Sequence, residues 1–105
     1  MNTSGMQRGY MAKNMKAEEF LKVVLTALTR EFEKEYKLES INDNEFRINL
    51  GDYKININKE LIEKYKTPYG LDKFILGELE KQGFKFSRNR SQYIQYCFGN
   101  YNGAK

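Results

Sequence analysis

The sequence predicts a single α+β domain made of helices and two β-hairpins. Three observations support this class: a long stretch in which apolar residues repeat every three or four positions, a stretch in which they alternate with polar residues, and two short helical stretches that meet at a proline. The chain has 105 residues, of which 40% are hydrophobic, and this is enough to bury one modest core. A wholly disordered chain is therefore excluded.

The first helix is expected to begin near Asn14, which suits the N-cap position. The residues before it, 1–13, show no periodicity and include two glycines, so we expect them to form a flexible basic arm. The apolar face of the helix is expected to consist of Leu21, Val24, Leu25, Leu28, Phe32 and Tyr36.

A β-hairpin is expected next, because apolar and polar residues alternate over 45–50 and 53–58. Gly51-Asp52 would form a two-residue turn, which places Leu50 opposite Tyr53. In that register six apolar side chains share one face, which the first helix can cover: Phe46, Ile48, Leu50, Tyr53, Ile55 and Ile57.

A helix-turn-helix is expected between Asn58 and Gly83. Asn58 suits the N-cap of a short helix, and Thr67-Pro68 ends that helix, because proline disfavours helical geometry at the residue before it. A second helix is expected over about 68–82, with Gly83 in the left-handed conformation that often follows a helix. Its outward positions are expected to include Asp72, Lys73, Leu76, Glu78, Glu80 and Lys81.

The last predicted element is a second hairpin, with strands at 84–88 and 92–98 around Asn89-Arg90-Ser91. We therefore expect one domain over residues 14–99 and a flexible tail over 100–105. Cys97, the only cysteine, is expected to be a small residue of the last strand.

Composition excludes several classes of function. Without histidine and with one cysteine, the chain cannot assemble a Ser-His-Asp or Cys-His arrangement or a common zinc site. We therefore expect no enzyme activity, no metal and no cofactor. No apolar run approaches the roughly 18 residues of a membrane span, and no secretory signal is recognisable, so we expect a cytoplasmic protein that does not act at a membrane.

Charge is distributed unevenly along the chain, whose net charge is +4. Residues 1–16 contain Arg8, Lys13 and Lys16 and no acidic residue. Residues 84–105 likewise contain basic residues and no acidic residue. All 14 acidic residues lie between these ends. A slightly acidic body with two basic ends indicates a polyanionic partner.

The order of helix, hairpin, helix-turn-helix and hairpin over residues 16–98 resembles that of winged helix-turn-helix DNA-binding proteins, in which the final hairpin is the wing. The frequent use of Lys, Asn, Ile and Tyr suggests an AT-rich source. The chain also resembles small accessory DNA-binding proteins of clostridial conjugative plasmids. This resemblance implies double-stranded DNA as the partner and a homodimer on repeated or palindromic half-sites. It also implies a role at a plasmid origin of transfer (oriT), where a relaxase would be a further partner.

The expected DNA contacts centre on the wing, because the second helix of the helix-turn-helix carries acidic outward residues that phosphates repel. Arg88 and Arg90 can contact guanine in a bidentate manner or enter a narrow minor groove, and nothing in the local sequence neutralises them. Only the first turn of the helix suits a phosphate. The candidate DNA-binding residues are Lys85, Ser87, Arg88, Asn89, Arg90, Ser91, Gln92 and Gln95 of the wing, Tyr69 and Lys73 of the helix, and Lys13 and Lys16 near the arm.

Three alternatives stay open at this point. The basic hairpin could bind an acidic protein surface, which would make the chain an interaction module or inhibitor. Tyr93, Tyr96 and Phe98 could stack on the bases of single-stranded nucleic acid, although alternate residues of this strand are expected to pack against the helices. A basic hairpin can also simply keep an edge strand soluble.

Overall fold

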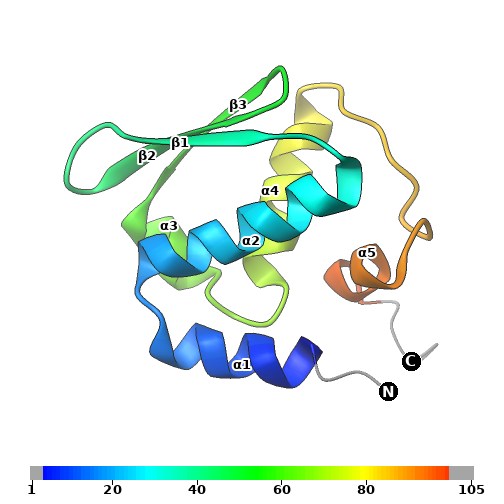
Figure 1. The fold of residues 1–105 in the computed structure, drawn as a ribbon, viewed down its shortest axis with the longest axis horizontal. Coiled ribbons are helices and arrows are strands. Elements are labelled where there is room, and N and C mark those ends of the chain that lie inside the picture. Colours follow the sequence, from blue (N-terminus) through cyan, green and yellow to red (C-terminus); the bar gives the residue numbers. More distant parts are fainter. Residues whose placement is uncertain (1–3, 100–105) are drawn as a thin grey trace.

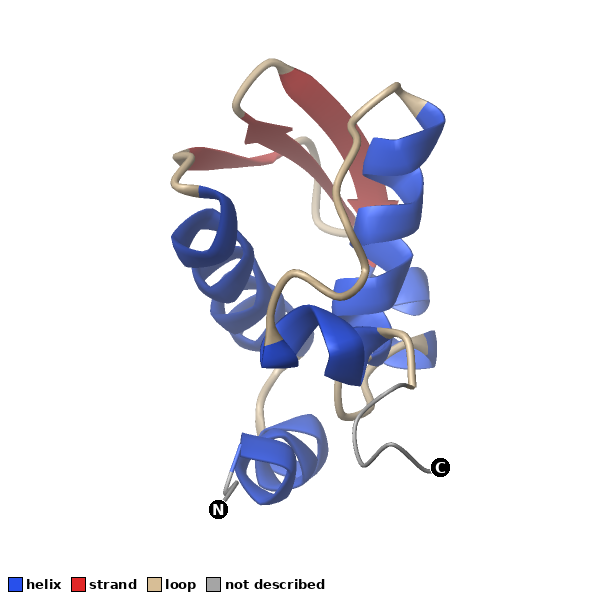
Figure 2. Ribbon diagram, turned by 90° about the vertical axis from the view of Figure 1, so that its right-hand side faces the viewer, coloured by secondary structure: helices blue, strands red, loops and turns tan. Residues whose placement is uncertain are grey.

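The computed structural model describes residues 4–99, which form an α+β fold of helices and one three-stranded antiparallel sheet (Figure 1). In both ribbon views the sheet lies at one end of the molecule and the first helix at the opposite end, while the last helix lies at an intermediate level (Figures 1 and 2). The elements in chain order are α1 (Ser4–Asn14), α2 (Ala17–Phe32), β1 (Tyr36–Ser40), β2 (Glu45–Leu50), β3 (Tyr53–Asn58), α3 (Lys59–Lys64), α4 (Gly70–Lys81) and α5 (Gln92–Cys97).

Helix α2 lies at the centre of the core, in contact with α3, α4 and β1. The helix ends at Phe32 because Glu33 adopts a left-handed backbone with φ of 53°, and the Glu33 N–H donates to the Thr29 carbonyl. Tyr36 therefore begins strand β1, and our expectation that it belongs to the helix is wrong. The rest of the predicted apolar face is confirmed, since four of its members are fully buried: Leu21, Val24, Leu25 and Leu28.

The hairpin of β2 and β3 has the predicted register, with Leu50 opposite Tyr53. Gly51 in the turn has φ of +59°, a backbone that glycine adopts without a steric penalty. Strand β1 was not expected; it pairs with the other edge of β2 and places Tyr36 opposite Leu50. The inward face of the hairpin packs into the core through Phe46, Ile48, Leu50, Ile55 and Ile57.

The helix-turn-helix is formed by α3 and α4. The Asn58 side chain accepts a hydrogen bond from the Leu61 N–H at 2.8 Å, so the predicted N-cap of α3 is confirmed. Helix α4 begins at Gly70, after Tyr69, and therefore starts two residues later than expected. Proline at 68 lies in the turn and not in the first helical position.

The C-terminal end of α4 agrees with the prediction. Gly83 has φ of +100°, and the N–H groups of Gly83 and Phe84 donate to the carbonyls of Glu80 and Leu79, both at 3.0 Å. This pair of hydrogen bonds is a Schellman motif, which closes the helix. Two outward assignments were wrong, because the side chains of Asp72 and Leu76 are fully buried.

The expected C-terminal hairpin is not present among the described residues. Residues 84–91 form an irregular segment, and α5 replaces the second predicted strand. The Ser91 hydroxyl accepts a hydrogen bond from the Ile94 N–H at 3.1 Å, which caps the helix. Ile94 and Cys97, one turn apart, are both buried. Helix capping and a buried helical face thus determine this stretch.

The expectation of a flexible arm before Asn14 is also corrected, because residues 4–14 form helix α1. Met11, Ala12 and Met15 pack against the core, which provides the apolar contacts that stabilise a short helix. Asn14 ends α1 instead of capping α2, and its side chain donates to the Tyr10 carbonyl at 2.8 Å. The helix lies close to the α3–α4 turn, because a Cβ at Gly9 would lie 3.9 Å from Cγ of Pro68. The remaining parts of the predicted arm and the predicted tail lie outside the described residues.

Candidate nucleic-acid interface

Arg90 is bound to helix α2. Its Nε donates to Oε2 of Glu31 at 2.7 Å, and its Nη2 donates to the Glu31 carbonyl at 3.3 Å. The guanidinium also lies over the ring of Phe32, 4.5 Å from the centroid. Only 13% of the Glu31 side chain is exposed but 40% of the Arg90 side chain is, so solvent still reaches the arginine side of this ion pair.

Arg88 is bound in the same way to helix α4 and to the residue after α5. Its Nη2 lies 3.0 Å from Oε1 of Glu80, and its guanidinium lies 4.1 Å from the ring centroid of Phe98. The expectation that nothing neutralises Arg88 and Arg90 is therefore wrong. That expectation considered only neighbours in the sequence, whereas the carboxylates of Glu80 and Glu31 come from other elements of the fold.

The aromatic residues of segment 84–98 pack against the body of the molecule. The ring of Phe32 makes edge contacts with Phe84 at 5.0 Å and with Phe86 at 5.7 Å between centroids. Tyr53 of the hairpin also contacts Phe84, at 5.5 Å. Phe84 and Phe86 are therefore used for packing. The three rings expected as a stacking platform, Tyr93, Tyr96 and Phe98, are partly buried and also pack against the core.

The polar candidates of this segment have local structural roles. The Ser87 hydroxyl accepts from the Asn89 N–H at 3.2 Å, and the Gln95 amide donates to the Asn89 carbonyl at 3.3 Å. Ser91 caps α5. Lys85 and Gln92 are exposed and could contact a ligand without breaking a hydrogen bond shown by the described residues.

The first turn of α4 is not open to a phosphate, which corrects a further expectation. The carboxylate of Asp72 lies in this turn, is fully buried and accepts a hydrogen bond from the Tyr93 hydroxyl of α5. Tyr69 is buried too, and its ring packs against Tyr93 and Tyr96 with centroids 6.2 Å and 5.4 Å away. This end of α4 therefore holds α5 in place.

Lys73 remains exposed, and the fold brings it close to Arg88. Its Nζ lies 6.0 Å from the ring centroid of Phe98, the same ring on which Arg88 stacks. Lys73 of α4 and Arg88 of the irregular segment, both candidate DNA-binding residues, therefore lie near the same ring. Lys13 and Lys16, at the junction of α1 and α2, are also exposed.

Three stretches of chain without an acidic residue lie next to one another on the side of the molecule away from the sheet: α1, the α3–α4 turn and α5 (Figures 1 and 2). Gly9 lies against Pro68, and Tyr69 lies against Tyr93 and Tyr96, so each pair of neighbours is in contact. We call this surface the basic end and define its cations as Lys13, Lys16 and Lys66.

Sequence reasoning missed part of the basic end. Lys66, in the α3–α4 turn, was not a candidate because the turn was considered only as a helix boundary. Its Nζ lies 3.7 Å from Glu63, and its stem is largely covered. Helix α1 could have been recognised from Met11 and Met15, which stand four residues apart beside Ala12.

Other kinds of site receive no support from the described part of the chain. Residues 4–99 contain no group of three or more His, Cys, Asp or Glu side chains that could hold a metal ion. None of the helices described is both long and apolar enough to cross a membrane. Comparisons with models of protein families, with curated proteins and with solved structures find no match for this chain.

Proposed function

We propose that the protein binds double-stranded DNA through the basic end and has no catalytic activity of its own. The observation that carries this proposal is the convergence of α1, the α3–α4 turn and α5, none of which contains an acidic residue, with the cations Lys13, Lys16 and Lys66 at this end. Duplex DNA carries one negative charge per about 1.7 Å of its axis, so the lysines of this surface gain affinity from counterion release. Glu18 and Glu63 line one hollow with Lys16 and offset part of that gain.

The helix-turn-helix places its turn, between α3 and α4, within this surface. DNA-binding proteins of this class commonly use the pair of helices to position themselves on the duplex. The winged arrangement is proposed here only in a modified form, in which segment 84–91 with Lys85 and Arg88 lies beside the duplex as an irregular loop. The resemblance extends the proposal to a homodimer on repeats of an origin of conjugative transfer, together with a relaxase.

The test is a fluorescence anisotropy titration of labelled duplex DNA at several salt concentrations. We compare Lys13→Glu/Lys16→Glu, which reverses two charges of the basic end, with Lys37→Glu/Lys54→Glu, which reverses two exposed charges on the sheet. The first variant should bind at least about tenfold more weakly and lower the salt slope by about 2, because each phosphate contact contributes about 0.9. The sheet variant should keep the slope of the unchanged protein.

Two results would contradict the proposal. One is an absence of binding at low salt, and the other is an equal loss of affinity in both charge-reversal variants. A single-stranded oligonucleotide of the same sequence is titrated in parallel. If it binds more tightly than the duplex, the single-strand alternative replaces this one.

A further inference from the structure

A groove on the outer face of α4 is not accounted for by DNA binding. It has a volume of about 430 Å³ and lies between α4 and the end of α3. Tyr65 forms one wall, and the α4 residues along it lie one turn apart on a single face: Gly70, Lys73, Phe74, Gly77 and Lys81. Tyr65 and Phe74 stack on each other, with centroids 4.7 Å apart and planes at 23°.

Gly77 has no explanation within the chain itself. It lies in the middle of α4, where glycine weakens a helix relative to alanine. A Cβ at this position would meet no atom within 4 Å, so neither packing nor backbone conformation requires glycine here. By contrast, a Cβ at Gly70 would lie 2.2 Å from the Thr67 hydroxyl, so the fold itself requires Gly70. The missing side chain at 77 leaves the floor of the groove open to another molecule.

The rim of the groove is cationic. Lys73 and Lys81 lie on α4, and Nζ of Lys64 lies 5.5 Å from the ring centroid of Tyr65. The only carboxylate in the groove, that of Glu78, lies 3.0 Å from Nζ of Lys81. An apolar floor with a positive rim fits an occupant that is apolar at its centre and negative at its edges.

We propose that this groove binds an acidic amphipathic helix of a partner protein. An apolar side chain of that helix would enter the space above Gly77 and contact Phe74, while flanking carboxylates would lie near Lys64, Lys73 and Lys81. This is the arrangement by which grooves on proteins bind helical peptides. The proposal does not depend on the proposed DNA binding, because none of the three lysines that define the basic end lines the groove, although Tyr65 of the α3–α4 turn forms one of its walls.

A second copy of the chain fits the groove less well. Lys73 and Lys81 each lie four residues from Gly77, so in an antiparallel two-fold crossing at Gly77 the Lys73 of one copy would face the Lys81 of the other. In a parallel two-fold crossing each lysine would face its own equivalent. Both arrangements bring like charges together, which is unfavourable.

Duplex DNA fits less well for a different reason. A helix that reads the major groove needs projecting side chains, whereas the middle of this face is hollow at Gly77.

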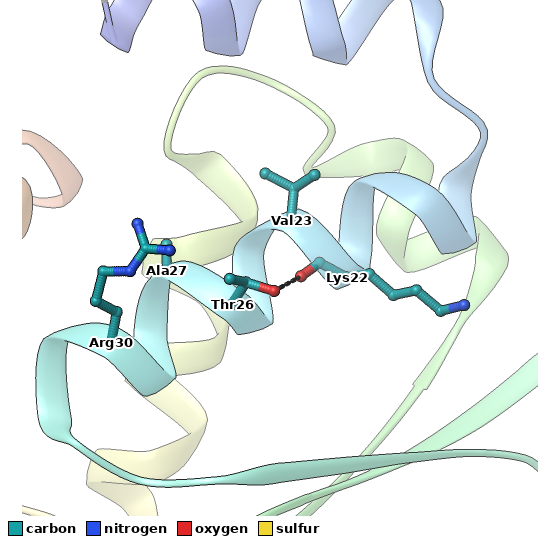
Figure 3. A pocket seen from close by; sticks show the side chains of 5 residues that line it. All are labelled: Lys22, Val23, Thr26, Ala27 and Arg30. Carbon is teal, nitrogen blue, oxygen red and sulfur yellow. Dashed lines mark hydrogen bonds between the residues drawn. The ribbon is translucent and has the colours of Figure 1, made fainter.

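A second hollow, on α2, provides a matched control. It has a volume of about 340 Å³ and is lined by Lys22, Val23, Thr26, Ala27 and Arg30. Figure 3 shows cations at its two ends and a hydrogen bond from the Thr26 hydroxyl to the Lys22 carbonyl, 2.8 Å long. This hollow has the same kind of charge but no aromatic wall and no glycine.

The experiment uses the full chain and a labelled helical peptide with leucines at i, i+4 and i+7 and glutamates on either side. A second peptide carries lysines in place of the glutamates, and a third carries alanines in place of the leucines. Binding is measured by anisotropy, and the site is located by amide chemical shifts. Gly77→Leu fills the groove, and Ala27→Leu fills the hollow on α2.

The glutamate peptide should shift the amide resonances of Phe74 and Gly77. Gly77→Leu should lower the affinity for this peptide about tenfold or more. Ala27→Leu and the duplex should leave these shifts unchanged. The proposal is overturned if the glutamate peptide does not bind, if either other peptide binds equally well, or if Gly77→Leu has no effect. It is also overturned if duplex DNA shifts the same amides, because the groove would then bind nucleic acid. Far-ultraviolet circular dichroism of both variants establishes that the fold is retained.

Discussion

The β2–β3 hairpin and the segment from Phe84 to Phe98 both contain alternating apolar and polar residues, but only the first forms strands. In the hairpin, Gly51 provides the positive φ that a two-residue turn requires. Among residues 84–98, no position has a positive φ. Instead Ser91 caps a helix at the place where the second turn was expected.

The two regions also differ in what holds them. The hairpin is held by the ladder hydrogen bonds of three strands and by apolar side chains buried on one face. Segment 84–91 has no ladder and is held by edge contacts between rings and by Arg88 and Arg90. The comparison teaches that alternation predicts a strand only where a turn residue and a neighbouring strand are both available. It also predicts that the hairpin is far more sensitive to single substitutions than the segment.

The largest effect is expected in the hairpin, from Phe46→Ala. The Phe46 side chain is 2% exposed, so its truncation removes apolar contacts and leaves a cavity. We expect a loss of about 3–5 kcal/mol in the free energy of unfolding, measured by urea denaturation. Ile41→Ala, in the exposed β1–β2 loop, is the control and should change it by less than about 0.5 kcal/mol. A loss for Phe46→Ala as small as that of the control would contradict the assigned core.

The turn of the hairpin should be the next most sensitive position. Gly51→Ala forces a side chain into the left-handed region, at a cost of about 1–2 kcal/mol, and its Cβ would lie 3.2 Å from Cδ of Lys34. Thermal unfolding should show the loss. Gly51→Asn should be milder, because asparagine tolerates this conformation better. If both variants are as stable as the unchanged protein, the turn does not determine the hairpin.

These differences explain how much of the fold could be predicted from sequence. Helices α2, α3 and α4 and the hairpin follow from spacing, caps and turn residues that act locally, such as Asn58 and Gly83. Strand β1 has only Tyr36 and Leu38 partly buried, which is too weak a pattern to recognise. Helix α1 has a short sequence signal in Met11 and Met15 beside Ala12, and the fold adds the contacts with the core that stabilise it.

The charge pattern that suggested the candidate site is visible in the sequence, but the contacts of its side chains are not. The absence of acids at both ends of the chain is visible in the sequence and survives in the basic end. The pairing of Arg90 with Glu31 joins residues 59 positions apart, and that of Arg88 with Glu80 requires the chain to turn back after α4. No local pattern contains either pair, so the two arginines could not be identified as structural residues beforehand.

In segment 84–98, removal of the helix cap should have a moderate effect. Ser91→Ala deletes the acceptor of the Ile94 N–H and should cost about 1 kcal/mol, within a range of about 0.5–2. Hydrogen exchange should show faster exchange at Ile94 and in the rest of α5, with the hairpin unaffected. Ser91→Asp restores the acceptor and should recover most of the protection. Uniformly faster exchange in both regions would mean that α5 does not open separately.

The smallest effect is expected from Arg90→Ala, although Arg90 contacts both Glu31 and Phe32. Its side chain is 40% exposed, so solvent screens the Glu31 pair, and we expect a loss of no more than about 1 kcal/mol that decreases with added salt. Arg90→Lys keeps the charge but loses the second donor and the stacking on Phe32, so it should recover only part of the loss. Arg30→Ala, also on the surface at α2, removes a cation that makes no ion pair with any described residue and is the control. Urea denaturation at two salt concentrations measures all three variants. A loss of stability for Arg90→Ala as large as that for Phe46→Ala would contradict this expectation and would show that segment 84–91 stabilises the fold as much as the core does.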